Sequence, residues 1–439
     1  MAMESDLHLT RRTFLKRGAL ALVSIGTVPM WGPSFLQQLV FAAEPTRGGG
    51  RKILICLFQR GAVDGLSMVV PFGDKNYYAS RSEIALAAPT QKAGAEGVLD
   101  LDGFFGFNPN LAALLPVYKA GHIAIIQACG SPSSTRSHFD AQDFMECGVA
   151  EDKSIRSGWL NRTLLACPED RAKISSFRAV AMTAMLPRSL QGDYEALAIP
   201  DLKVFGVRGA EALGGGMTNA RAANGFEGMY EGAVDSVLHG TGKEAFDAMA
   251  ALKKANPTKY SPQNGAQYPN GAFGRALMQI AQMIKADLGV EVAFAEIGGW
   301  DTHANQGGAT GQLANRFTEF SKGLAALYQD LGDRMADVVI LTMSEFGRTV
   351  RQNGNRGTDH GHATCFMVMG GPVHGGKVYG KWPGLAREQL YEGRDLALTT
   401  DYRDVFAEIA QKHLGARELA KIFPEFNVDP TRYRAIIRT

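Results

Sequence analysis

The 439-residue sequence has little net charge and no long apolar run, and each of these shortages excludes a class of protein. The formal net charge is +2, and much of the positive excess lies before residue 53, so the rest of the chain has no basic field that would attract nucleic acid. The apolar stretch 18–29 is shorter than the ~20 residues of a membrane helix and is broken by glycine and proline. We therefore expect neither nucleic-acid binding nor anchoring in a membrane.

Cysteine is also scarce, with five residues, an odd number. No two of them form a CxxC pair, which excludes a zinc ribbon and a thioredoxin-like motif. Cys56, Cys129 and Cys365 lie in apolar runs and are expected to be buried as small hydrophobic residues. The sequence leaves open whether Cys147 and Cys167 form a disulfide.

The N-terminus carries an export pattern. Residues 10–16, Thr-Arg-Arg-Thr-Phe-Leu-Lys, match the twin-arginine motif, and small residues near Ala42 suit cleavage by a signal peptidase. We expect a signal peptide over 1–43, the twin-arginine translocase as partner, and a periplasmic or extracellular mature protein. The alternative is an uncleaved N-terminal anchor. Proteins that use this route cross the membrane folded, which suits a protein that acquires metal first.

Beyond the leader, apolar runs of strand length alternate with amphipathic stretches. This alternation predicts a single α/β domain over 44–439 with a central, mainly parallel sheet between helices. Weaker strand signals and many glycines predict an inserted helical and loop region at about 151–265. The expected strands are 52–58, 123–127, 290–297, 338–343 and 365–369, and the main expected helices are 137–147, 272–288, 316–331 and 402–414.

Acids, histidines and hydroxyls collect where expected strands end or begin. Because ligands of open α/β sheets bind at the carboxyl ends of strands, we expect these segments to converge. Three carboxylates and three histidines among them have the composition of a site for divalent metal, Zn²⁺ or Mn²⁺. Neighbouring glycines allow the tight turns that such a site needs. The six residues are Asp64, Asp301, His303, Asp359, His360 and His362.

A hydroxyl at the start of the expected helix 137–147, from Ser137 or Thr135, would lie where free amide groups favour an anion. Two metal ions could activate this hydroxyl for displacement. Arg136 or Arg348 would neutralise the anionic oxygens of a substrate.

Each of these residues also has a plain structural interpretation. Asp64 can form an Asp-Gly turn, and Ser137 can cap a helix without any chemistry. Glu345 and Arg348 can be an ordinary surface pair. His138, directly after Ser137, can pack or reach the site.

Four motifs together resemble one known family: Arg-Ser-His-Phe at 136–139, Gly-Gly-Trp-Asp-Thr-His at 298–303, Ser-Glu-Phe-Gly-Arg-Thr at 344–349 and Gly-Thr-Asp-His-Gly-His at 357–362. They are similar to exported bacterial proteins of the DUF1501 family, which has no assigned function. The resemblance covers the chain from about Lys52 and implies an alkaline phosphatase-like fold with a two-metal site. It implies Ser137 as nucleophile and gives metal-binding roles to Asp64, Asp301, His303, Asp359, His360 and His362.

These features favour a metal-dependent hydrolase of phosphate or sulfate esters, with an anionic ester as substrate. The alternative is a binding or assembly protein that keeps the alkaline phosphatase-like fold without catalysis. A metal-free serine hydrolase is a third candidate, and the absence of a Gly-x-Ser-x-Gly elbow counts against it.

Overall fold

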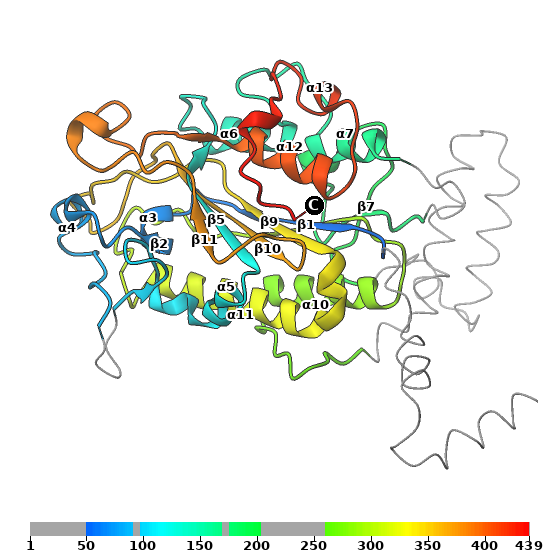
Figure 1. Cartoon of the computed structure of the whole chain (residues 1–439), viewed down its shortest axis with the longest axis horizontal. Helices are drawn as coiled ribbons and strands as arrows, with labels where there is room; N and C mark the ends of the chain where they lie inside the picture. The colour runs from blue at the N-terminus through cyan, green and yellow to red at the C-terminus, as the bar shows by residue number, and fades with distance from the viewer. Residues whose placement is uncertain (1–49, 91–96, 169–174, 203–259, 439) are drawn as a thin grey trace, which may run out of the picture. The chain divides into compact units, whose positions relative to one another are not determined.

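The computed structural model describes residues 50–90, 97–168, 175–202 and 260–438 (Figure 1). The expected signal peptide over 1–43 lies outside the described residues, as does much of the expected insertion at about 151–265. From Arg51 onward the described residues belong to one compact unit.

A nine-stranded sheet forms the centre of this unit. Its central strand β1 pairs in parallel with β8 and β9. Among the described strands of this sheet, only β10 runs against its neighbours, since it is antiparallel to both β9 and β5. In order across the sheet lie β11 (Lys377–Tyr379), β5 (Ile123–Gly130), β10 (Thr364–Gly370), β9 (Val338–Met343), β1 (Ile53–Gln59), β8 (Val292–Ile297), β6 (Ala179–Ala181) and β7 (Leu197–Ala198), with β12 (Thr400–Asp401) beside β5.

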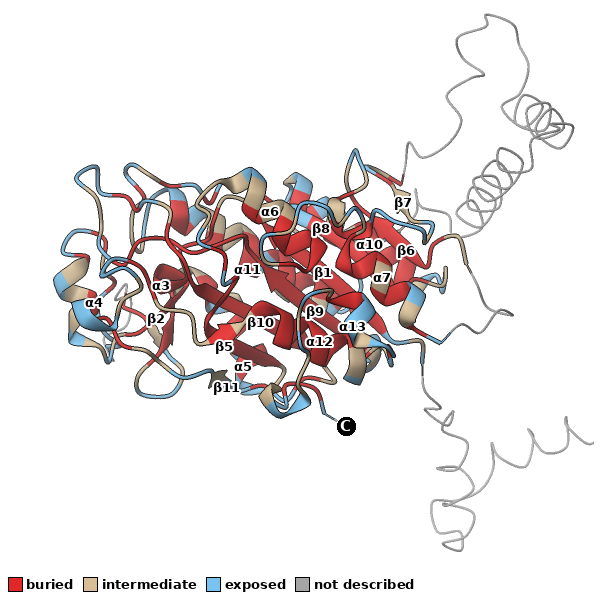
Figure 2. Cartoon of the chain, turned by 90° about the horizontal axis from the view of Figure 1, so that it is seen from above, coloured by how far each residue is buried: buried red, intermediate tan, exposed pale blue. Residues whose placement is uncertain are grey.

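Helices cover both faces of the sheet (Figure 1). Alternate residues of β1 point to opposite faces, so Ile55 packs in one apolar cluster with Phe320, and Cys56 in another with Phe406. Both clusters are buried, which explains why the strands read as continuous apolar runs (Figure 2). One face carries α5 (Leu115–Lys119), α10 (Ala272–Lys285) and α11 (Gln312–Leu331), and the other α6 (His138–Cys147), α7 (Trp159–Ala166), α12 (Tyr402–Lys412) and α13 (Leu419–Ile422).

Shorter elements complete the described unit. A second, small sheet, ordered β2-β4-β3, contacts the main one, since Gln127 of β5 donates to the carbonyl oxygen of Val69. These elements are α3 (Gly65–Met68), β2 (Val69–Val70), α4 (Lys75–Ser80), β3 (Leu99–Asp100), β4 (Gly106–Phe107) and the 3₁₀ helices η1 (Pro109–Leu114), η3 (Arg188–Leu190), η5 (Gly332–Asp337), η6 (Arg387–Gln389) and η7 (Pro430–Arg432).

The prediction of a mixed α/β fold with a central, mainly parallel sheet between helices is confirmed. The region at about 151–265 differs from a pure helix-and-loop insertion, because its described part adds β6 and β7 to the main sheet. All five cysteines are buried and free, so Cys147 and Cys167 form no disulfide. Among the described residues, no helix combines the length and the apolarity that crossing a bilayer requires.

The direction of β10 explains how the chemical segments meet. The strands β1, β5, β8 and β9 are all parallel, so their carboxyl ends lie at one edge. Because β10 is reversed, it starts at this same edge, and the segment 357–362 that precedes it joins the others there.

Candidate metal centre

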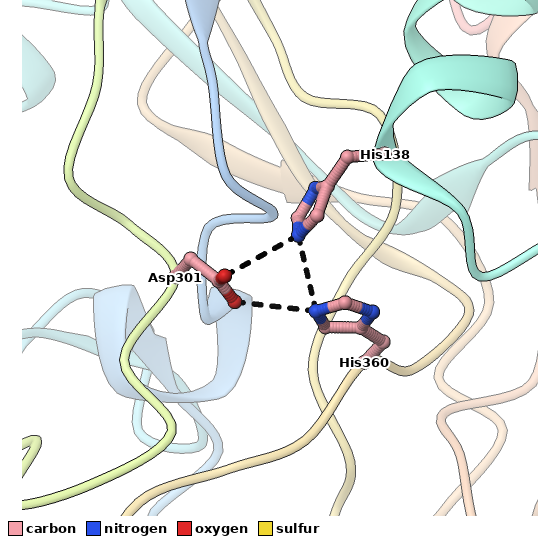
Figure 3. A group of neighbouring side chains, drawn as sticks. All are labelled: His138, Asp301 and His360. Carbon is pink, nitrogen blue, oxygen red and sulfur yellow. Dashed lines mark hydrogen bonds and ion pairs between the residues drawn. The ribbon is translucent and has the colours of Figure 1, made fainter.

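Three side chains meet at this edge of the sheet (Figure 3). His138 is the first residue of α6, Asp301 follows β8, and His360 precedes β10. One ligand atom from each lies within 4.8 Å of the other two. Nε2 of His360 is 3.0 Å from Nε2 of His138 and 3.2 Å from Oδ1 of Asp301. Nε2 of His138 is 3.5 Å from Oδ2 of Asp301.

The ring of His138 is oriented by a buried carboxylate. Its Nδ1 donates to Oε1 of Glu345 at 2.9 Å, because an ionised carboxylate only accepts. Glu345 also accepts from the amide of Gly61 and from Gln142, and these bonds together with His138 hold its pKa below the ordinary value although burial alone raises it. The proton on Nδ1 leaves the Nε2 lone pair of neutral His138 directed at the cluster.

The other two rings are oriented in the same way. Nδ1 of His360 donates to the carbonyl oxygen of Arg136 at 2.8 Å. Nδ1 of His303 donates to Oδ1 of Asp359 at 2.9 Å, and this bond lowers the pKa of Asp359. His303 lies against the group of three, with Nε2 3.0 Å from Nε2 of His360 and 2.9 Å from Asp301.

This arrangement fits a metal ion. Two imidazole lone pairs 3.0 Å apart repel each other unless a proton or a cation lies between them. Ligand atoms around one zinc ion are about 3.3 Å apart, given Zn–N bonds of about 2.0–2.1 Å, and the separations here are 3.0, 3.2 and 3.5 Å. Metal-bound histidines commonly donate their outer nitrogen to a carboxylate or a carbonyl, as these do. His138, Asp301 and His360 therefore have the chemistry to hold a divalent metal.

Asp301 is placed by an arginine. Nη1 of Arg348 donates to its Oδ1 at 2.6 Å, and the rest of the guanidinium binds Thr358. Burial alone raises the pKa of Asp301, but Arg348 and His303 together lower it, so the carboxylate stays ionised. The side chain of Arg348 is fully buried and that of Asp301 is 43% exposed, so the cluster can be reached from solvent.

Asp64, expected as a metal ligand, does not reach this cluster. Both of its oxygens bind the guanidinium of Arg81, at 2.6 and 3.0 Å, and further bonds come from Ser67 and Gln306. Burial alone raises the pKa of Asp64, but Arg81 and these bonds bring it below the ordinary value. The side chains of Arg81 and Asp64 are both buried, so the structure gives Asp64 the role of a buried ion-pair partner.

Three other expected roles also change. Asp359 contacts the outer nitrogen of His303 and so orients a ring. His362 is buried and stacks on Tyr391 with ring centroids 4.2 Å apart, away from the group of three. The guanidinium of Arg136 binds Glu392 and Asp395 instead of facing an open site.

Ser137 caps α6, since its Oγ accepts from the amide of Asp140 at 3.5 Å. Thr135 accepts from the amide of Ser137. The sequence leaves the role of His138 open and does not indicate Glu345 as its partner. A histidine that opens a helix directly after a strand-end loop was the available signal.

Comparison with known proteins identifies the family of the chain. A family model described as "Protein of unknown function (DUF1501)" matches residues 127–423, which is more than half of the sequence. The chain belongs to this family. A comparison with curated proteins found no match.

Solved structures similar to this DUF1501 chain include an alkaline phosphatase from the Antarctic bacterium TAB5, at 11% identity, a TM-score of 0.30, and coverage of 74% of this chain and 93% of that one. A substituted form of the TAB5 enzyme with magnesium bound is 14% identical, with a TM-score of 0.30 and coverage of 73% and 90%.

Replacing Glu345 by glutamine should weaken zinc binding about 10- to 100-fold at neutral pH, because the Nδ1–H of His138 loses its charged acceptor. The same hydrogen bond to Glu345 raises the pKa of His138. Protons therefore compete with metal below that raised pKa, and the pH below which zinc affinity begins to fall should move lower in Glu345→Gln, where His138 is easier to deprotonate. Competition with a coloured chelator between about pH 5 and 8 measures both effects.

Glu418→Gln is the control, since Glu418 forms an exposed pair with Lys421 on the short helix α13. It should match the unchanged protein at every pH. Equal zinc affinity in Glu345→Gln and Glu418→Gln would contradict the role given to Glu345.

Gly357→Ala should displace His303. A Cβ at Gly357 would lie 2.3 Å from the main-chain carbon and oxygen of His303, far inside contact distance. Gly354→Ala is a matched control in the same loop, because a Cβ there meets nothing within 4 Å. Zinc affinity measured in parallel should fall several-fold in Gly357→Ala only, and equal values for the two variants would show that His303 adds nothing to the centre.

Proposed function

We propose that this DUF1501 chain is a metal-dependent hydrolase of phosphate or sulfate esters, with the metal held by His138, Asp301 and His360. One observation carries the proposal: the ligand atoms of these side chains converge, and each ring is fixed through its outer nitrogen. A divalent ion, zinc or manganese, would supply positive charge for the anionic ester.

Ser137 provides the nucleophile in this proposal. It directly precedes the proposed ligand His138, and among the described residues its hydroxyl is held by one long hydrogen bond, of 3.5 Å, from the Asp140 amide. The Ser137 oxygen forms a bond to phosphorus or sulfur while the ester oxygen departs as the alcohol with a proton. Water then breaks the new serine ester, which releases phosphate or sulfate and restores the hydroxyl.

Purified protein tests the proposal directly. Elemental analysis should find stoichiometric divalent metal, and the loaded protein should turn over an aryl phosphate or an aryl sulfate. Ser137→Ala should keep the metal and lose turnover, whereas Thr135→Val should keep both. Metal-free protein, or loaded protein that is inactive on both esters, would contradict the hydrolase.

A non-catalytic binding or assembly protein is the second candidate. The observation that favours it is that Arg136 and Arg348, the two guanidinium groups expected to meet the substrate, are both engaged by carboxylates. Tight metal binding without turnover, together with a stable complex with another exported protein, would support this role.

The proposed setting of either role is outside the cytoplasm, after twin-arginine export, with an alkaline phosphatase-like fold. The motif at 10–16 supports the route. Cell fractionation with both Arg11 and Arg12 replaced by lysine should show the protein retained in the cytoplasm.

A further inference from the structure

Asp395 lies outside the metal-binding group but holds two arginines that both contact His360. Its side chain is fully buried. Oδ2 accepts from Nη2 of Arg136 at 2.8 Å and from Nη2 of Arg394 at 3.0 Å, while Oδ1 accepts from Nε of Arg394 at 2.9 Å. One buried carboxylate thus brings two guanidinium groups together.

These two arginines hold His360 at opposite ends. The carbonyl oxygen of Arg136 accepts from Nδ1 of the His360 ring at 2.8 Å. Nη2 of Arg394 donates to the main-chain oxygen of His360 at 2.6 Å. Ring and backbone are therefore both fixed through groups that Asp395 holds.

We propose that Asp395 is a positioning residue of the metal centre, which sets the orientation of His360 through Arg136 and Arg394. This inference rests on the proposed function only in that the centre binds metal. The guanidinium groups of Arg136 and Arg394 both bind Oδ2 of Asp395. Without this negative charge they repel each other, and their movement apart would disturb the hydrogen bonds that both arginines form with His360.

Glu392 offers a matched comparison. It binds the same Nη2 of Arg136 at 2.7 Å, but its side chain is 53% exposed. An exposed pair of this kind contributes little, and Glu392 has no bond to Arg394 that would couple it to the main chain of His360. Asp395→Asn and Glu392→Gln thus remove the same kind of charge from the same arginine.

Two measurements on the purified full chain separate these variants. In chelator competition with Zn²⁺ alone, Asp395→Asn should bind about 10- to 100-fold more weakly than the unchanged protein, and Glu392→Gln should stay within about twofold. In metal-free protein labelled with ¹⁵N-histidine, the His360 signal, identified by its loss in His360→Gln, should report the Nδ1–H tautomer. That signal should become a mixture of tautomers in Asp395→Asn only.

Arg394→Met is the second variant, for the case in which Asp395→Asn does not fold. It removes the donor to the His360 carbonyl while Asp395 stays paired with Arg136, and it should weaken zinc binding about tenfold. Unchanged zinc affinity and an unchanged tautomer in both variants would overturn the inference. Loaded protein that turns over neither ester would end the hydrolase proposal and leave this one standing. Unchanged protein that binds no zinc would end the metal centre, and with it the positioning role of Asp395.

Discussion

His360→Gln should lower zinc affinity by at least about a hundredfold and remove any ester hydrolysis that depends on the ion. Its Nε2 is within 3.2 Å of both other donors, so its loss leaves His138 and Asp301 with one ring fewer to share the ion. The effect should exceed the 10- to 100-fold typical of partners that only orient a ligand. Isothermal titration with Zn²⁺ measures it.

His374→Gln serves as the control, since His374 is exposed and among the described residues its ring forms a hydrogen bond only with Lys377. Its titration should superimpose on that of the unchanged protein. Circular dichroism of His360→Gln should show intact secondary structure, because the ring of His360 is partly exposed and contacts Phe346 outside the two large apolar clusters of the sheet. A titration of His360→Gln that matched the His374 control would dismiss the metal centre.

Arg81→Met should destabilise the chain by about 3–5 kcal/mol, because it leaves the buried carboxylate of Asp64 without its cation. Side-chain exposures of 0% for Arg81 and 1% for Asp64 keep both groups out of contact with bulk solvent. Urea unfolding gives the free energy of unfolding directly. Lys421→Met is the matched control, because it breaks a similar pair at 74% and 61% exposure and should cost less than about 1 kcal/mol.

The double variant Asp64→Leu with Arg81→Met decides what Asp64 does. Removing both charges should recover part of the lost stability, since an apolar pair of similar volume often replaces a buried ion pair. Zinc affinity should be unchanged, because Asp64 does not belong to the group that can hold the ion. A hundredfold loss of zinc binding in this variant would restore Asp64 as a ligand.

The sequence predicts most of the fold correctly, because strands that are buried on both faces of the sheet appear as continuous apolar runs. The run 338–343 is predicted as a strand, and β9 has these bounds, with all six residues buried. The strands at Ala179–Ala181 and Leu197–Ala198 were missed because two or three residues at the edge of a sheet make too short a pattern.

The site is predicted in part. Histidines and aspartates of the segments 298–303 and 357–362 do come together, as strand-end placement implies. The partners of Asp64 and His362 are not predictable, because they depend on tertiary contacts. Arg81 donates to Asp64, and Tyr391 stacks on the ring of His362. Sequence spacing cannot show that His360 joins the group of three while His362 is buried elsewhere.

The reversed strand β10 also bears on when the proposed ion could bind during folding. His138 and His360 are separated by 222 positions in the sequence, and Asp301 and His360 by 59. The strands that carry these donors are joined through the series β8-β1-β9-β10-β5, so the three donors lie together only when all of these pairings are in place. A bound ion would then act as a reversible cross-link between three remote points, and ion uptake during refolding would time the completion of the sheet.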